Sequence, residues 1–318
     1  MAVTLERSKR VVIGGEIGED LINSTNTMSL KKYKRDMTGR NLSPKSIYNY
    51  ERDILQWFRY VYKFQDNMSV KEITVDEIED FIYYCQEEGN NAERIRRRIA
   101  SISAFYKFLR RKRIVENNPM EFLPRPKKGL PVVVQTYVTK KQYEELREKL
   151  NELGNLQLQT YAMFSFSTMA RVNAVASVKW EQIDFEERIV EDVLEKEGKI
   201  VPLYFSEEVK DLLLKLKAER EEKGIDCPYV FATKYGGKYD KANTTTLRKW
   251  AKKVGNLIGI NLHPHDFRHS YATLLVNNGM PIETVSGLLN HEGLDVTNKF
   301  YIKKDKSRIQ GQKDKYSI

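Results

Sequence analysis

Apolar residues recur at helical intervals along the first third of the chain. One such stretch begins where Ser43 precedes Pro44, and a second begins at Thr74 and stops at Gly89. A serine or threonine before an apolar stripe is typical of a helix N-cap, and proline favours the first helical position. A third stretch, from about Asn91, places its apolar side chains within one narrow stripe and predicts a buried helix face. This stripe consists of Ile95, Ile99, Ile102, Tyr106 and Leu109.

The second half of the chain contains one stretch in which the helical period is interrupted. Residues 139–154 predict an amphipathic helix, and residues 156–170 predict a buried one. The stretch VKWEQIDFEERIVEDVLEKEGKIVPLYF is rich in β-branched and aromatic residues around a turn-like KEGK, which predicts two or three short antiparallel strands. Helical patterns return from Ser206 onward. We therefore expect a mainly α protein with a small antiparallel β-sheet.

Prolines mark the boundary between two predicted domains. The stretch NNPMEFLPRPKKGLPVV combines four prolines with a glycine, a composition that ends helices and forms a semi-rigid linker. A length of 318 residues also favours two domains. We expect an N-terminal arm over 1–26, a helical domain over 27–118, a linker over 119–135, a second domain over 136–302 and a tail over 303–318.

Positive charge is concentrated in the third predicted helix. The chain has 54 lysines and arginines against 44 acidic residues, a net charge of +10. Nine basic residues and no acidic one lie between Arg94 and Arg113, so this window carries nearly all of the excess. A solvated helix face is one interpretation, but the absence of acids favours a polyanion such as DNA. The predicted DNA contacts are Arg94, Arg96, Arg97, Arg98, Lys107, Arg110, Arg111, Lys112 and Arg113.

The cysteines and the apolar stretches bear on the cellular compartment. Cys85 and Cys227 lie far apart in apolar surroundings, which favours neither a disulfide framework nor a CxxC metal site. The N-terminal MAVTLERSKRVVIGG lacks the apolar core of a secretory signal, and no stretch approaches the roughly 18 apolar residues of a membrane span. We expect a reducing, cytoplasmic location and no membrane partner.

The motif HPHDFRHS holds three of the four histidines of the chain. Histidines spaced two and four apart suggest a zinc site, but no nearby cysteine and no HExxH pattern completes a ligand set. A helix entry with Asp266 in its first turn is a second interpretation. Neither explains the pairing of an imidazole with Arg268, which is suited to a phosphate, because arginine offers a planar donor fork and imidazole can exchange a proton.

This motif begins a longer stretch, HDFRHSYATLLVNNGMPIETVSGLLNHEGLDVTNKFY, which resembles the C-terminal signature of the tyrosine recombinases, the phage integrase family. In that family an HxxR pair and a later histidine precede a nucleophilic tyrosine. A first arginine lies in a string matched here by STMARVNAVASV, and a β-hairpin lysine lies in one matched by EKEGKIVPL. The residues that match the catalytic set are Arg171, Lys196, His265, Arg268, His291 and Tyr301. Lys199 is the second choice for the hairpin lysine.

The resemblance implies covalent phosphoryl transfer without a cofactor or a metal ion. Tyr301 would attack a phosphodiester while His265 accepts its proton, which leaves a 3′-phosphotyrosyl intermediate. Arg171 and Arg268 would hold the non-bridging oxygens. The hairpin lysine would protonate the departing 5′-oxygen, and the later histidine would donate a hydrogen bond to the phosphate.

The resemblance extends over about residues 27–302, because the first domain is similar to the helical core-binding domain of the family. It implies that this domain and a mixed α/β catalytic domain clamp double-stranded DNA. It also implies a DNA-dependent homo-tetramer formed from a protein that is a monomer or dimer in solution.

Four features depart from the family pattern. The acidic residue expected three places after the first arginine is Ala174, and the glycine and leucine before that arginine are Met169 and Ala170. Asn290 replaces the glycine before the later histidine, and the step from that histidine to Tyr301 is ten positions, one longer than usual. Two hypotheses follow: an active site-specific recombinase or integrase, and a DNA-binding regulator with the recombinase fold and weak or lost strand cleavage.

Overall fold

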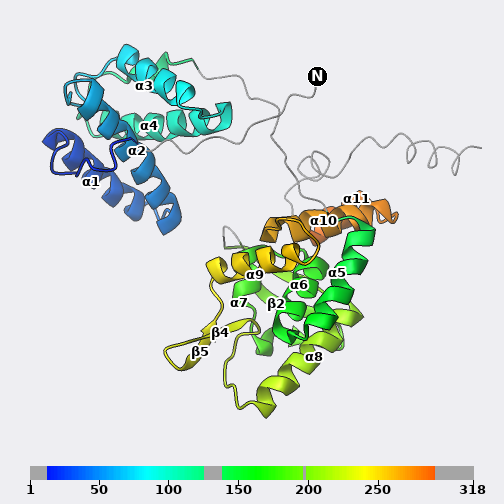
Figure 1. The fold of residues 1–318 in the computed structure, drawn as a ribbon. Helices are drawn as coiled ribbons and strands as arrows, with labels where there is room; N and C mark the ends of the chain where they lie inside the picture. Colours follow the sequence, from blue (N-terminus) through cyan, green and yellow to red (C-terminus); the bar gives the residue numbers. More distant parts are fainter. Residues whose placement is uncertain (1–12, 125–137, 196–197, 291–318) are drawn as a thin grey trace, which may run out of the picture. The chain divides into compact units, whose positions relative to one another are not determined.

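The computed structural model describes residues 13–124, 138–195 and 198–290 (Figure 1). The chain divides into two compact units, Met1–Val133 and Val134–Ile318. None of the helices in these ranges is both long enough and apolar enough to cross a membrane.

Four α-helices build the described part of the first unit. They are α1 (Ser24–Gly39), α2 (Pro44–Phe64), α3 (Val75–Glu87) and α4 (Ala92–Arg111). The predicted caps Ser43 and Thr74 both accept backbone hydrogen bonds at the starts of α2 and α3, and Thr74 forms a capping box with Glu77. The predicted apolar stripe of α4 is buried, with no member more than 1% exposed, so the third predicted helix and its core face are confirmed.

Both ends of this unit differ from the sequence-based expectation. Helix α1 was not predicted, although Leu30, Tyr33 and Met37 have helical spacing and are buried. Part of the predicted arm belongs to the core, since Ile13, Ile17 and Ile22 pack into the main apolar cluster. The start of the predicted linker also packs there, through Met120 and Leu123 beside the short 3₁₀ helix η1 (Pro119–Glu121).

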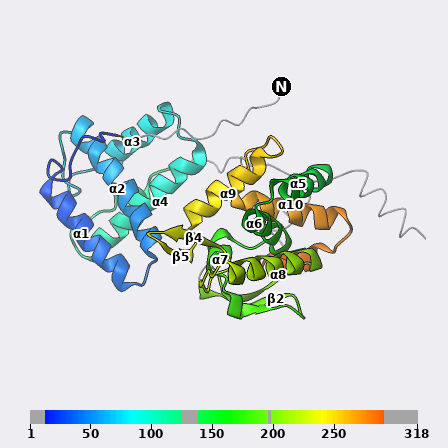
Figure 2. The ribbon, with the colours of Figure 1, turned by 60° about the horizontal axis from the view of Figure 1, so that its bottom comes forward.

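Helix α6 forms the centre of the second unit, with α5, α8, α9 and α10 packed around it (Figures 1 and 2). The predicted amphipathic helix is confirmed as α5, which begins after the cap Thr139 and ends at Gly154 in the left-handed conformation, with φ 64°. The predicted buried helix is confirmed as α6. The helices are α5 (Lys140–Leu153), α6 (Leu156–Thr168), α7 (Val172–Ser177), α8 (Glu207–Glu222), α9 (Thr244–Asn256), α10 (Pro264–Asn277), α11 (Ile282–Leu288) and the 3₁₀ helix η2 (Trp180–Gln182).

Two small antiparallel sheets complete the described part of this unit. Strands β1 (Ile183–Asp184), β2 (Ile189–Leu194) and β3 (Ile200–Tyr204) pair in the order β1-β2-β3, which confirms the predicted strands. Strands β4 (Ala232–Tyr235) and β5 (Lys238–Lys241) form a hairpin that was not predicted, with Gly236 and Gly237 at its turn. The prediction of a mainly α fold with a small antiparallel sheet is confirmed.

Candidate active site

The HPHDFRHS motif forms the entry of α10. His263 is the N-cap and Pro264 takes the first helical position, while the His263 backbone N–H donates to the Asp266 carboxylate over 2.7 Å. Asp266 therefore lies in the first turn, as predicted. Helical spacing brings the rings of His265 and His269 together, with their centres 6.1 Å apart. Within the described ranges, no three side chains of His, Cys, Asp or Glu are grouped to hold a metal ion.

Arg268 lies one turn further along α10 and is only 3% exposed. Its Nη1 donates to the carbonyl oxygen of Met169 over 2.8 Å, and its Nη2 donates to the carbonyl oxygen of Leu289. Charged donors form strong bonds to buried carbonyls, so the guanidinium is fixed between two turns of the chain. One of these turns directly precedes Arg171, and the other directly precedes His291.

Both turns contain a residue that replaces a glycine of the family pattern. Met169 has φ 52° and Asn290 has φ 50°, which is the left-handed region that favours glycine. The side chain of Met169 is buried in a small apolar cluster under α10 and α11, so its packing offsets the strained backbone. The other buried members of this cluster are Ala272, Val276, Val285 and Leu289.

Arg171 is the N-cap residue of α7, and its side chain is 31% exposed. Its Nη1 forms an ion pair with Glu195, the first residue after β2, whose side chain is 2% exposed. Ala174, which stands where the family has an acid, is fully buried. The side chain of Arg171 is thus partly exposed, while a buried carboxylate pairs with its guanidinium.

His265 is exposed to solvent at the start of α10. Crowding by neighbouring protein atoms lowers its pKa below the ordinary value of 6.5, and the charges of Arg268 and Arg171 lower it further. Arg248 on α9 acts in the same direction, whereas Asp266 opposes it. The ring is therefore neutral at pH 7 and able to accept a proton.

His269 has a lower pKa than its neighbour. Burial, followed by the charges of His265 and Arg268, lowers the pKa of His269 to about 4. This ring is therefore neutral throughout the physiological range.

The structure brings together three of the six predicted catalytic residues: Arg171, His265 and Arg268. The other three, Lys196, His291 and Tyr301, lie outside the described residues. Lys199 closes the β2–β3 hairpin, where its carbonyl oxygen accepts the Glu195 N–H over 2.8 Å. The choice between Lys196 and Lys199 remains a prediction, as do the catalytic roles of the whole set.

One of the nine predicted DNA contacts, Arg98 of α4, was wrong. Arg98 is 1% exposed, its Nε donates to Asn90 over 2.8 Å, and its guanidinium lies 5.7 Å from the centre of the Phe81 ring. Burial lowers the pKa of its guanidinium. The side chain of Arg98 is therefore part of the core of the first unit and does not face DNA.

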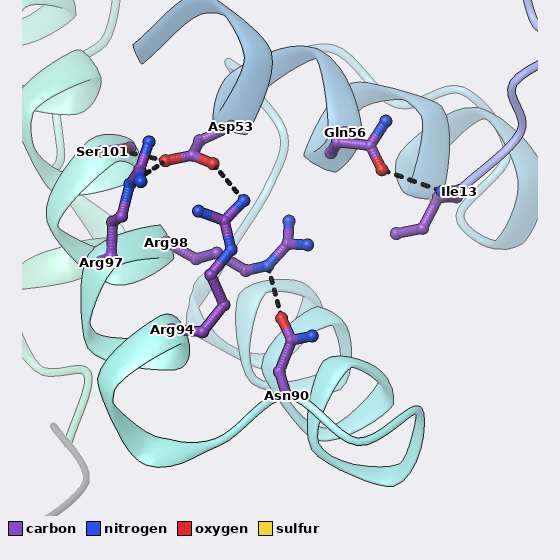
Figure 3. A network of polar contacts seen from close by, with 8 residues as sticks. All are labelled: Ile13, Asp53, Gln56, Asn90, Arg94, Arg97, Arg98 and Ser101. Carbon is purple, nitrogen blue, oxygen red and sulfur yellow. Dashed lines mark hydrogen bonds and ion pairs between the residues drawn. The ribbon is translucent and has the colours of Figure 1, made fainter. Parts of the chain in front are cut away.

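Other arginines of α4 pair with acidic side chains of the first unit. Arg94 and Arg97 both point to the buried carboxylate of Asp53, at 2.8 and 3.2 Å, and Ser101 donates to the same carboxylate over 3.0 Å (Figure 3). Near the end of the helix, two more arginines pair with acids that are distant in sequence. The pairs are Arg110 with Glu121, and Arg111 with Asp36.

Exposed cations that DNA could reach lie at the C-terminal end of α4 and on α1. Lys107, Lys112 and Arg113 are exposed and have no acidic partner within the described part of the chain. Lys32 and Arg35 of α1 line one surface hollow together with Lys112. The two α1 residues were missed because this helix was not predicted.

Comparison with known protein families identifies the family of this chain. The model of the Phage integrase family matches residues 136–308, more than half of the chain, and that of the phage integrase N-terminal SAM-like domain matches residues 30–113. The chain belongs to the phage integrase family, the tyrosine recombinases. The predicted family is thereby confirmed.

Individual tyrosine recombinases match over most of their length. Tyrosine recombinase XerC of Bacillus licheniformis is 27% identical over 288 residues, which cover 85% of this chain and 90% of the relative. Among solved structures, the Tn1549 transposon integrase in complex with transposon right end DNA has a TM-score of 0.70 at 16% identity, over 91% of this chain and 99% of the other. A lambda integrase tetramer bound to a Holliday junction has a TM-score of 0.67 at 16% identity, over 88% of this chain and 78% of the other. These structures support the recombinase fold.

Proposed function

We propose that this recombinase cuts and rejoins double-stranded DNA at a specific site through a 3′-phosphotyrosyl intermediate. The observation that carries the proposal is the hydrogen bond from Arg268 of α10 to the carbonyl oxygen of Met169, two residues before Arg171, which brings both arginines near His265. Two fixed guanidinium groups beside a neutral imidazole suit a phosphodiester, since charge develops on its non-bridging oxygens while the attacking hydroxyl loses a proton. The regulator hypothesis has no comparable observation in its favour.

In the proposed cleavage step, the Tyr301 hydroxyl oxygen forms a bond to phosphorus and the bond from phosphorus to the 5′-oxygen breaks. His265 accepts the phenolic proton, and the hairpin lysine, Lys196 or Lys199, donates a proton to the departing 5′-oxygen. His291 donates a hydrogen bond to the phosphate. The reverse reaction with a different 5′-hydroxyl rejoins the strand, so the phosphotyrosyl bond conserves the energy and neither ATP nor a metal ion is needed.

The two domains have separate roles in this proposal. The first unit contributes non-specific affinity through exposed cations on α1 and α4, because phosphate neutralisation releases counterions. The second unit contributes the chemistry. We further propose the domain limits given above, a clamp around DNA, a homo-tetramer that forms on two duplexes, and a cytoplasmic location.

A covalent trapping experiment tests the cleavage proposal. Selection from a random duplex library first identifies the bound site, which is then made with a nick close to the cleavage position so that the released fragment diffuses away. We expect the protein to form an adduct that survives a denaturing gel, and Tyr301→Phe to form none while binding with unchanged affinity. Tight, sequence-specific binding without any adduct would refute cleavage and support the regulator hypothesis.

A further inference from the structure

Glu195 is a buried carboxylate that pairs with Arg171 in the candidate active site, and no motif assigns it a role. We propose that Glu195 is a positioning residue, which holds the Arg171 guanidinium in the orientation that binds the scissile phosphate. This inference rests on the proposed function. Glu195, from the β2–β3 hairpin, would then replace the acidic residue that the family has at the position of Ala174.

The geometry of the Arg171–Glu195 pair is suited to holding the Arg171 guanidinium in one orientation. Arg171 is the N-cap residue before a six-residue helix, and its long side chain is 31% exposed. Arginine has several rotatable bonds, so an exposed guanidinium without a fixed partner samples many positions. The Glu195 carboxylate is 2% exposed and forms an ion pair with Nη1. Glu195 is itself held, since its backbone N–H donates to the Lys199 carbonyl oxygen over 2.8 Å at the closure of the hairpin.

The burial of this carboxylate is costly, which argues against an incidental surface pair. Its Oε1 atom is buried and has no hydrogen-bond partner within the described ranges. A buried carboxylate with one free oxygen destabilises a fold unless its charge has a use, because desolvation offsets much of the attraction to its partner. Exposed ion pairs contribute little and carry no such cost. The burial of the Glu195 carboxylate is therefore explained better by a functional role, orienting Arg171, than by a contribution to the stability of the fold.

A competing role would be inhibition, in which Glu195 neutralises Arg171 and keeps phosphate away. The two roles predict opposite signs when the charge is removed. A positioning carboxylate makes cleavage slower on removal, whereas a masking carboxylate makes it faster. Because the pair involves Nη1 and the side chain still reaches solvent, we favour positioning.

The experiment compares Glu195→Gln, which keeps the shape and removes the charge, with Glu195→Asp, which keeps the charge on a shorter stem. Glu191→Gln is the matched control, since Glu191 is an exposed glutamate of β2. The measurements are the first-order rate of adduct formation at saturating protein, the DNA dissociation constant and the thermal unfolding midpoint. Each change is also made in an Arg171→Lys background.

We expect Glu195→Gln to slow adduct formation by about 10- to 100-fold, the usual cost of a misplaced catalytic group, while the dissociation constant changes less than about threefold. Glu195→Asp should recover part of the rate, and Glu191→Gln should match the wild type. In the Arg171→Lys background the effect of Glu195→Gln should shrink, because the two residues act as one unit. A purely structural role would lower the unfolding midpoint and leave the two effects additive, which would overturn the proposal.

A Glu195→Gln rate equal to or above that of the wild type would also overturn it, and a faster rate would indicate masking. Absence of any adduct from the wild type would instead overturn the proposed cleavage, on which this inference rests. If Glu195→Gln does not fold, Glu195→Asp and the Arg171→Lys background still decide, because a positioning role requires their effects on rate to be non-additive.

Discussion

Met169 offers a quantitative test of how this chain tolerates losing a glycine beside its active site. Replacing Met169 by glycine removes a side chain that is 1% exposed and packs under α10 and α11. Truncating a buried methionine costs about 3 kcal/mol, and the extra freedom of glycine in the unfolded chain adds about 0.5–1 kcal/mol. Relief of the left-handed backbone at φ 52° returns about 1–2 kcal/mol. The net prediction is a loss of about 2 kcal/mol in the free energy of unfolding.

Alanine at the same position separates packing from backbone strain. Met169→Ala loses the same packing but keeps the strain, so it should cost about 3 kcal/mol, roughly 1 kcal/mol more than Met169→Gly. Met28, which is 58% exposed on α1, is the matched control, and Met28→Ala should lie within about 0.5 kcal/mol of the wild type. The assay is urea unfolding of the full chain. If alanine proves as stable as glycine, the strain argument fails; if glycine stabilises the protein, the packing argument fails.

Two further predictions concern DNA affinity and pH. Arg98→Met should leave the salt dependence of DNA binding unchanged, because Arg98 is buried. Lys107→Met should reduce the slope of log affinity against log salt by up to about 0.9, because Lys107 is exposed. Equal slopes for the two variants would contradict the conclusion that Lys107 contacts DNA and Arg98 does not. Because its surroundings lower the pKa of His265 below 6.5, more than half of the base is still neutral at pH 6.5, and the midpoint of the fall in the rate of adduct formation should lie below that pH. An inflection above pH 6.5 in the pH–rate profile would exclude His265 as the proton acceptor.

Local signals predicted much of the fold. The caps Ser43, Thr74 and Thr139 depend on hydrogen bonds to residues two or three positions away, which the sequence shows directly. The buried face of α4 likewise follows from the helical period of its apolar residues. Helix α1 and the β4–β5 hairpin had usable signals, an apolar stripe and a Gly-Gly turn, that were not used. The prediction that Arg98 contacts DNA was wrong because the helical period was not applied to it. At 100° per residue Arg98 lies only 60° from Ile95, near the edge of the buried stripe.

The site depended more on tertiary structure. The HxxR pair was predictable because His265 and Arg268 share one helix. The Arg171–Glu195 pair spans 24 residues and two elements, and the influence of Arg248 on His265 comes from a different helix, so no spacing in the sequence indicates either. The pairing of Arg94 and Arg97 with Asp53 is likewise a long-range contact, which changes the number of cations available to DNA.

The central claim is that Tyr301 becomes linked to a 3′-phosphate, and the chemical identity of the trapped bond tests it most directly. Trypsin cuts after Lys299 and Lys303, so the adduct, trimmed by nuclease, should yield the four-residue peptide Phe300–Lys303 carrying a nucleotide. Fragmentation should place the nucleotide on Tyr301 through its 3′-phosphate, while the released strand carries a free 5′-hydroxyl. A nucleotide on another tyrosine, or a 5′-phosphate linkage, would contradict the account.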